Sequence, residues 1–128
     1  MTQEEKQLLL RDLCTRLPYG VILHIEFYDL QGDGKLASRD IELTPGNIAY
    51  CFNNGHWVSV KPYLRLMSSM TDEEAAEFEI LSDKLLAEAD NTKIWNSVID
   101  WLNEHHFDHR GLIEKGLALE APEGMYNN

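Results

Sequence analysis

The sequence predicts an α+β fold, in which an N-terminal helix and two to three C-terminal helices pack on an antiparallel meander of about four strands. Residues 3–16, 72–89 and 92–106 repeat apolar side chains at helical spacing, whereas residues 21–28 alternate them with polar ones. Glycine-containing turns also separate short β-type segments at hairpin spacing. Helices confined to one face of such a sheet would leave its other face open.

The first predicted element is a helix over residues 3–16. Thr2 and Glu5 have the spacing of a capping box, in which each side chain accepts a hydrogen bond from the other residue's backbone N–H. Pro18 ends the pattern, because proline has no backbone N–H and clashes with the preceding turn. The apolar positions between these two signals are Leu9, Leu10, Leu13, Cys14 and Leu17.

Residues 21–28, VILHIEFY, are predicted to form a strand because the apolar period changes to two. One face is apolar throughout and is the predicted core face: Val21, Leu23, Ile25 and Phe27. The opposite face mixes Ile22, His24, Glu26 and Tyr28, as is typical of a half-exposed sheet.

The stretch that follows, DLQGDGKLASRD at residues 29–40, nearly matches an EF-hand calcium loop. Asp29, Asp33 and Asp40 occupy acidic ligand positions of that loop. An EF-hand has a helix on each side, but here the incoming segment is a predicted strand, and Pro45 would interrupt an outgoing helix. We therefore predict a hairpin that turns through Gly-Asp-Gly, and no calcium site.

Three further strands complete the predicted sheet. The return strand of the first hairpin covers about residues 35–43. Residues 48–52 and 56–60 are rich in β-branched and aromatic side chains, and they flank Asn53-Asn54-Gly55. Asn-Gly readily adopts the positive φ angles of a tight hairpin turn, so these two segments are predicted to pair.

A second helix is predicted over residues 72–89, where Thr71 and Glu74 form another capping-box pattern. Its acidic residues spread over the side away from the apolar stripe. The predicted core stripe consists of Ala75, Phe78, Leu81, Leu85, Leu86 and Ala89.

The exposed side of this helix contains a candidate partner-binding ridge. A thin apolar strip runs through the acidic surface, and the candidate residues are Glu73, Ala76, Glu77, Ile80 and Ala87. One interpretation is an ordinary solvated helix face, since single exposed apolar residues are common. The other is a contact surface for a partner protein or for a second copy of the chain.

A third helix is predicted from Thr92 to about His106, with Trp95 and Trp101 as core anchors on its broad apolar face. A short helical turn near residues 110–115 precedes an irregular tail from about residue 117. No repeat or linker divides the chain, so residues 1–128 are predicted to be a single domain.

The net charge of −11 is concentrated in one segment, because residues 72–90 hold eight acidic residues and only Lys84 in opposition. This disfavours direct binding of nucleic-acid phosphate, which depends on Lys and Arg. No segment reaches the ~18 apolar residues of a membrane helix. Cys14 and Cys51 lie in no zinc or disulfide pattern, and no targeting segment is present. We therefore expect a cytoplasmic protein without membrane contact.

The densest polar cluster is EHHFDH at residues 104–109. His105 and His109 have the spacing that places two imidazoles on one helix face, and His106 and Asp108 could add ligands to a metal site. A helix end near these residues would separate them, and histidines in a last turn are also favoured by the helix dipole. The sequence therefore predicts no metal site, and these four residues are the candidates should one exist.

Other catalytic signals are missing from the sequence. It has no Gly-x-Ser-x-Gly motif and no glycine-rich phosphate loop before a helix. Neither Cys14 nor Cys51 has a neighbouring base to activate its thiol. We therefore predict no cofactor and no catalytic residue. These observations disfavour an enzyme but do not exclude one.

Three stretches, RLPYGV, VKPYLRLMSSMTDEE and WLNEHHFDHRGLIEKGLALEAPEGMY, carry a resemblance to a known family. The chain is similar there to small acidic proteins of Bacteroides-type gut bacteria, an uncharacterised family whose genes often lie near phage-like or mobile genes. The resemblance implies a bacterial cytoplasmic accessory protein and is compatible with an origin in a mobile element. It implies no activity, cofactor or functional residue.

The function predicted from the sequence is a non-enzymatic interaction with a protein partner, or self-association, through the acidic helix at 72–90 or an open sheet face. Two alternatives stay open. One is a metal-dependent enzyme centred on residues 104–109, and the other is an acidic protein that mimics DNA by presenting carboxylates in place of phosphates.

Overall fold

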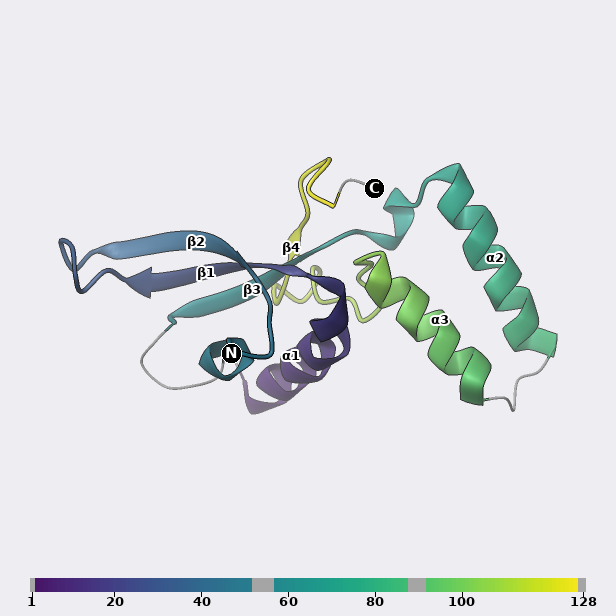
Figure 1. The fold of residues 1–128 in the computed structure, drawn as a ribbon, viewed down its shortest axis with the longest axis horizontal. Coiled ribbons are helices and arrows are strands. Elements are labelled where there is room, and N and C mark those ends of the chain that lie inside the picture. Colours follow the sequence, from purple (N-terminus) through teal and green to yellow (C-terminus); the bar gives the residue numbers. More distant parts are fainter. Residues whose placement is uncertain (1, 52–56, 88–91, 127–128) are drawn as a thin grey trace.

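The computed structural model describes residues 2–51, 57–87 and 92–126. The chain forms three α-helices, four strands and short 3₁₀ turns within these ranges (Figure 1). In chain order the main elements are α1 (Gln3–Arg16), β1 (Ile22–Tyr28), β2 (Leu36–Glu42), the 3₁₀ turn η2 (Ile48–Cys51), β3 (Ser59–Leu64), α2 (Asp72–Ala87), α3 (Thr92–Glu104) and β4 (Leu119–Glu120).

The sheet has the strand order β2-β1-β3-β4 and is mixed. β1 pairs antiparallel with both β2 and β3, whereas β4 pairs parallel with β3. The predicted α+β class and the β1–β2 hairpin are therefore confirmed, but the predicted antiparallel meander is wrong. Its fourth strand comes from the C-terminal segment that the sequence had suggested was irregular.

The predicted strand at residues 48–52 is also wrong, because its described part is the 3₁₀ turn η2. Thr44 and Asn47 explain the difference. The backbone N–H of Thr44 donates to Asn47 Oδ1 at 2.8 Å, and the backbone N–H of Asn47 donates to Thr44 Oγ1 at 3.2 Å. This reciprocal pair starts a helical turn just as a capping box does. The turn predicted at residues 53–55 lies outside the described residues.

The main core lies between α1 and the sheet. Leu9 and Leu13 of α1 are fully buried, and they pack with the predicted core face of β1 and with residues from the segment before β4. The capping box at Thr2 and Glu5 is present as predicted. The other buried members of this core are Val21, Leu23, Ile25, Leu43, Val60, Leu64, Leu112, Leu117 and Ala118.

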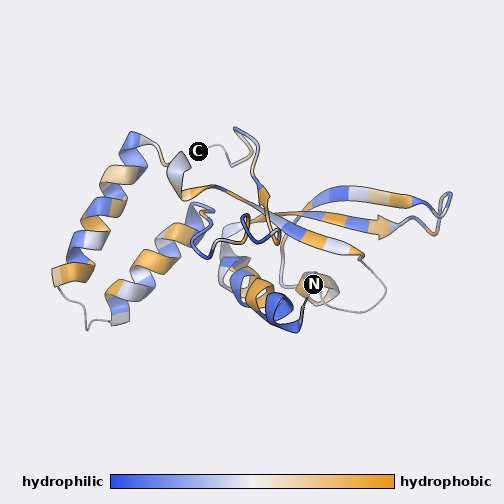
Figure 2. Ribbon diagram, turned by 180° about the vertical axis from the view of Figure 1, so that it is seen from behind, coloured by the Kyte–Doolittle hydropathy of each residue, from blue (hydrophilic) through white to orange (hydrophobic). Residues whose placement is uncertain are grey.

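Helices α2 and α3 form an arm that projects from one end of the sheet (Figure 1). They pack on each other, and no residue of α2 is buried. The prediction that both C-terminal helices pack on the sheet is therefore wrong, because their main contacts are with each other and, for α3, with α1. Figure 2 shows hydrophobic residues along both helices of the arm.

A second, smaller core holds the arm together. Phe78, Leu81 and Leu85 of α2 pack against the buried residues Val98, Leu102 and Phe107. Trp101 joins this cluster as predicted. Trp95, by contrast, is 51% exposed, and Leu86 of the predicted core stripe is 81% exposed. Helices α2 and α3 therefore carry more apolar residues at helical spacing than their contact with each other buries.

No helix in the described ranges has the length and apolarity needed to cross a membrane.

A buried ion pair fixes α1 to the segment after α3. Arg16 Nε and Nη2 donate to Asp12 Oδ2 and Oδ1 at 2.7 and 3.1 Å, and both side chains are inaccessible to solvent. Arg110 Nη1 donates to the same carboxylate at 2.9 Å, while Arg16 Nη2 donates to the carbonyl of Phe107 at 2.8 Å. Asp12 thus receives two guanidinium groups, one of them from outside its own helix.

We expect Asp12→Ala to lower the free energy of unfolding by about 3–5 kcal/mol, because it leaves the buried Arg16 charge without its counter-ion. Urea denaturation followed by tryptophan fluorescence measures this loss. Asp83→Ala, on the exposed surface of α2, is the control and should change stability by less than about 0.5 kcal/mol. A loss of under about 1 kcal/mol for Asp12→Ala would contradict this assignment.

Candidate functional site

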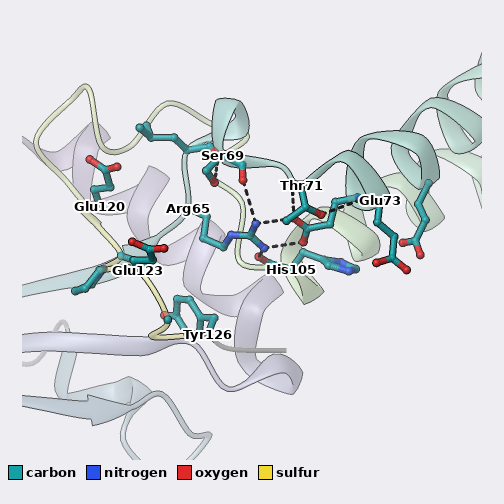
Figure 3. A pocket seen from close by; sticks show the side chains of 14 residues that line it. Arg65, Ser69, Thr71, Glu73, His105, Glu120, Glu123 and Tyr126 are labelled. Carbon is teal, nitrogen blue, oxygen red and sulfur yellow. Dashed lines mark hydrogen bonds and ion pairs between the residues drawn. The ribbon is translucent and has the colours of Figure 1, made fainter.

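A cavity of about 660 Å³ lies between the start of α2 and the C-terminal segment (Figure 3). We call it the acidic groove. Arg65 and His105 lie at its centre, and the first two turns of α2 form one wall. The other wall is the C-terminal strap, residues 119–126, which contributes Glu120, Ala121, Pro122, Glu123, Gly124 and Tyr126.

Arg65 is held in place by several groups. Its Nη1 and Nη2 donate to Glu74 Oε2 and Oε1 at 2.8 and 2.6 Å, and its guanidinium carbon lies 4.2 Å from the ring centre of Phe107. The Arg65 hydrogen bonds, followed by weaker effects of Thr71, lower the pKa of Glu74 to about 2, although partial burial opposes this shift. The only arginine in the groove lining is therefore neutralised by its partner.

The remaining charges of the groove are negative. Five glutamates and one arginine line it, and after Glu74 is paired four glutamates are left. Glu77 accepts a hydrogen bond from the indole Nε1 of Trp101 at 3.1 Å. Glu73 lies on one side of Arg65, and Glu120 and Glu123 lie on the other (Figure 3). The groove therefore presents carboxylates from two separate segments to whatever enters it.

Tyr126 anchors the strap to the sheet. Its hydroxyl donates to the carbonyl of Tyr63 at 2.7 Å and accepts from the backbone N–H of Ile22 at 2.8 Å. Its ring stacks on His106, with 3.7 Å between ring centres. Burial raises the pKa of Tyr126 to about 12, so the phenol keeps its proton at neutral pH.

The structure separates the four candidate metal ligands from one another. α3 ends at Glu104, and His106 has a φ of 64°. His109 Nε2 bonds to Asn103 Oδ1 at 2.9 Å, and Asp108 accepts from the backbone N–H groups of Leu112 and Ile113.

Two of these imidazoles are neutral at pH 7, the form that a metal binds, so it is the placement of the side chains and not their protonation that argues against a shared site. Burial lowers the pKa of both His106 and His109 to about 4, and His105 is fixed by a hydrogen bond of 2.8 Å between its Nδ1 and the carbonyl of Trp101. Across residues 2–51, 57–87 and 92–126, no three His, Cys, Asp or Glu side chains are placed to hold a metal ion together.

The three aspartates of the calcium-like stretch stabilise the hairpin. Asp29 accepts from the backbone N–H of Gly32 at 3.1 Å, and Asp33 accepts from that of Lys35 at 3.0 Å. Asp40 lies on β2, where its register partner is His24. Strands flank this stretch on both sides, so the hairpin prediction is confirmed.

Asp40 belongs to a polar network that the sequence did not reveal. His24 Nδ1 donates to Asp40 Oδ1 at 2.8 Å, and the hydroxyl of Tyr63 donates to the same oxygen at 3.1 Å. These three side chains come from β1, β2 and β3 and link the strands on one face of the sheet. They do not line the acidic groove.

Of the predicted partner-binding residues, Glu73 and Glu77 line the groove. Ala76, Ile80 and Ala87 lie outside it and are exposed, Ile80 to 60%. The sequence did not indicate Arg65, Glu120 or Glu123, which reach the groove only through the tertiary fold. Burial raises the pKa of the Cys51 thiol to about 11, so this cysteine is not an activated nucleophile.

Comparisons with family models, with curated proteins and with solved structures found no match to this chain.

The Arg65–Glu74 pair should make stability depend on acid pH. Because the folded pKa of Glu74 is about 2 and its ordinary value is 4.5, the pair stabilises the fold above pH 4.5 and loses this effect as pH falls toward 2. We expect Glu74→Gln to cost on the order of 2–3 kcal/mol at pH 7 and almost nothing near pH 2. Urea denaturation of both proteins across this pH range measures the difference. The exposed Glu79→Gln is the control, and a Glu74→Gln difference that stays constant with pH would refute the assignment.

Proposed function

We propose that this protein is an interaction module whose acidic groove binds a positively charged segment of a partner protein. The observation that carries the proposal is the placement of Glu73 and Glu77 on one wall and Glu120 and Glu123 on the other, around an arginine that is already neutralised. Lysine or arginine side chains entering this cavity would meet carboxylates on both sides. Such complementarity increases association rate and selectivity.

The charge of the arm also favours a basic partner over a second copy of the chain. Residues 72–90 carry a charge of −7 out of −11 for the whole chain, so two arms that approached each other would repel. A basic partner would instead be attracted to this region. DNA mimicry is a special case of this proposal, in which the partner normally binds phosphate.

A contact outside the groove extends the proposed surface. Glu73, Glu77 and Ile80 follow one another at four- and three-residue spacing, which places them on one face of α2. Ile80 is 60% exposed and lies about one helical turn beyond Glu77. The proposed partner segment therefore carries an apolar residue next to its basic ones.

Octa-arginine labelled with a fluorophore is a direct probe of the groove. We expect saturable binding that weakens steeply as salt increases, because the attraction is electrostatic. Glu73→Lys, Glu77→Lys should raise Kd at least about tenfold, which corresponds to about 1.4 kcal/mol. Fluorescence anisotropy measures Kd for each protein.

The matched control is Glu4→Lys, Glu114→Lys, which makes the same change in net charge at two exposed residues outside the groove lining. Its Kd should rise less than about threefold. Equal losses in the two double variants would mean that octa-arginine responds only to total charge, and the groove would then not be the binding site.

The contribution of Ile80 is tested with a peptide of six arginines and two leucines. We expect this peptide to gain affinity of about two- to fivefold in the wild type relative to Ile80→Ser, because an isoleucine at the rim offers only part of its apolar area. Octa-arginine should bind the two proteins alike. If Ile80→Ser weakens both peptides equally, Ile80 does not make the proposed apolar contact.

A further inference from the structure

The C-terminal strap is attached to the sheet through an unusual hydrogen-bond arrangement. The hydroxyl of Tyr126 lies between the backbone N–H of Ile22 and the carbonyl of Tyr63, where neighbouring strands would otherwise bond directly. One phenol oxygen therefore bridges β1 and β3. The other attachment is β4, which pairs with β3 over two residues and is extended by a bond of 2.8 Å from the N–H of Ala121 to the carbonyl of Leu64.

Two features oppose the docked position of the strap. Glu120 and Glu123 line the same cavity as Glu73 and Glu77, so the two walls repel each other. The strap also covers His106, whose Nδ1 is buried without a partner among the described residues, and an unpaired polar atom is better solvated when the strap is open.

The backbone of His106 is set by the end of α3 and not by the strap. Its φ of 64° belongs to the helix-terminating turn in which the N–H of His106 bonds to the carbonyl of Asn103 and the N–H of Phe107 bonds to that of Leu102. The hydrogen bonds, the ring stacking and the core contact of Tyr126 that dock the strap are thus opposed by charge repulsion and an unpaired nitrogen, which is the condition for an element with two accessible states.

We propose that the strap is a two-state wall of the acidic groove, latched by Tyr126, and that positive charge in the groove favours its closed state. This inference rests on the proposed function, because it takes the ligand to be cationic. A cationic ligand removes the repulsion between the walls, so ligand binding and strap closure stabilise each other reciprocally. Tyr126 then influences affinity through the position of the strap without contributing a charge.

Amide hydrogen exchange measured by NMR reports strap closure directly. The amides of Ile22 and Ala121 are bonded to the phenol of Tyr126 and to the carbonyl of Leu64, so both exchange faster when the strap opens. We expect saturating octa-arginine to raise their protection at least about threefold. The amide of Leu43, which bonds to the carbonyl of Val21 at 2.9 Å, is the internal reference and should not change.

Two measurements use the free protein and do not depend on the peptide. In the free protein, 0.5 M sodium chloride screens the walls and should itself raise the protection of Ile22 and Ala121 at least about twofold. Glu120→Gln, Glu123→Gln should do the same at low salt, whereas Glu4→Gln, Glu114→Gln should not. Tyr126→Phe should lower the protection of Ala121, whose own bond to the carbonyl of Leu64 the substitution leaves in place, and weaken octa-arginine binding several-fold with every glutamate still present.

The outcomes separate this inference from the proposed function. If octa-arginine binds the groove but leaves the protection of both amides unchanged, the coupling is refuted and the proposed function stands. If octa-arginine does not bind, the proposed function fails. The measurements in high salt and with Glu120→Gln, Glu123→Gln still decide whether charge controls the strap. A free protein whose strap protection responds to neither salt nor Glu120→Gln, Glu123→Gln overturns the two-state strap.

Discussion

The buried carboxylate of Asp12 is the interaction on which the arrangement of this fold depends. It receives Arg16 from its own helix and Arg110 from a segment almost a hundred residues away. Replacing a buried ion pair by apolar residues is often neutral or stabilising, so the pair is weak evidence for high stability. Its geometric effect is clearer, because Arg16 also holds the carbonyl of Phe107 and so sets where the chain leaves α3. We infer that the network specifies the position of this segment relative to α1.

The segment that begins at Phe107 in turn joins the two cores. Phe107 is completely buried in the smaller core of the arm, while its backbone forms a parallel bridge with Arg65 next to β3. Asp108 continues the connection, since its backbone N–H donates to the carbonyl of Arg65 and its carboxylate caps the turn that places Leu112 in the main core. The acidic groove lies at this junction of sheet, arm and strap. Arg65 bonds to Glu74 and to the carbonyls of Ser69 and His105, which fixes the α2 wall of the groove relative to the end of α3.

What the sequence could predict is the part of the fold that depends on local pattern. The capping box at Thr2 and the alternation in β1 determine α1 and the hairpin almost by themselves, because their signals lie within a few residues. Asp12 and Arg16 have the spacing of an ordinary exposed ion pair, and the groups that complete their buried network, the carbonyl of Phe107 and the guanidinium of Arg110, come from a distant segment. The same limit applies to the candidate site: helical phase pointed to Glu73 and Glu77, but the two-residue strand β4 that brings Glu120 to them has no periodicity to detect.

The distribution of carboxylates around the groove is the strongest argument that this surface has a partner. Acids in the first turn of α2 are favoured by the helix dipole, and Glu74 additionally pairs with Arg65, so the fold itself accounts for these charges. It does not account for Glu120 and Glu123 on the facing wall, where no helix dipole or arginine among the described residues compensates them. Uncompensated like charges lower the stability of the closed strap. A positively charged ligand would remove the repulsion between the two walls, and the free energy gained would favour both binding and the closed strap. The charge of the groove is thereby linked to the proposed two-state behaviour of its wall.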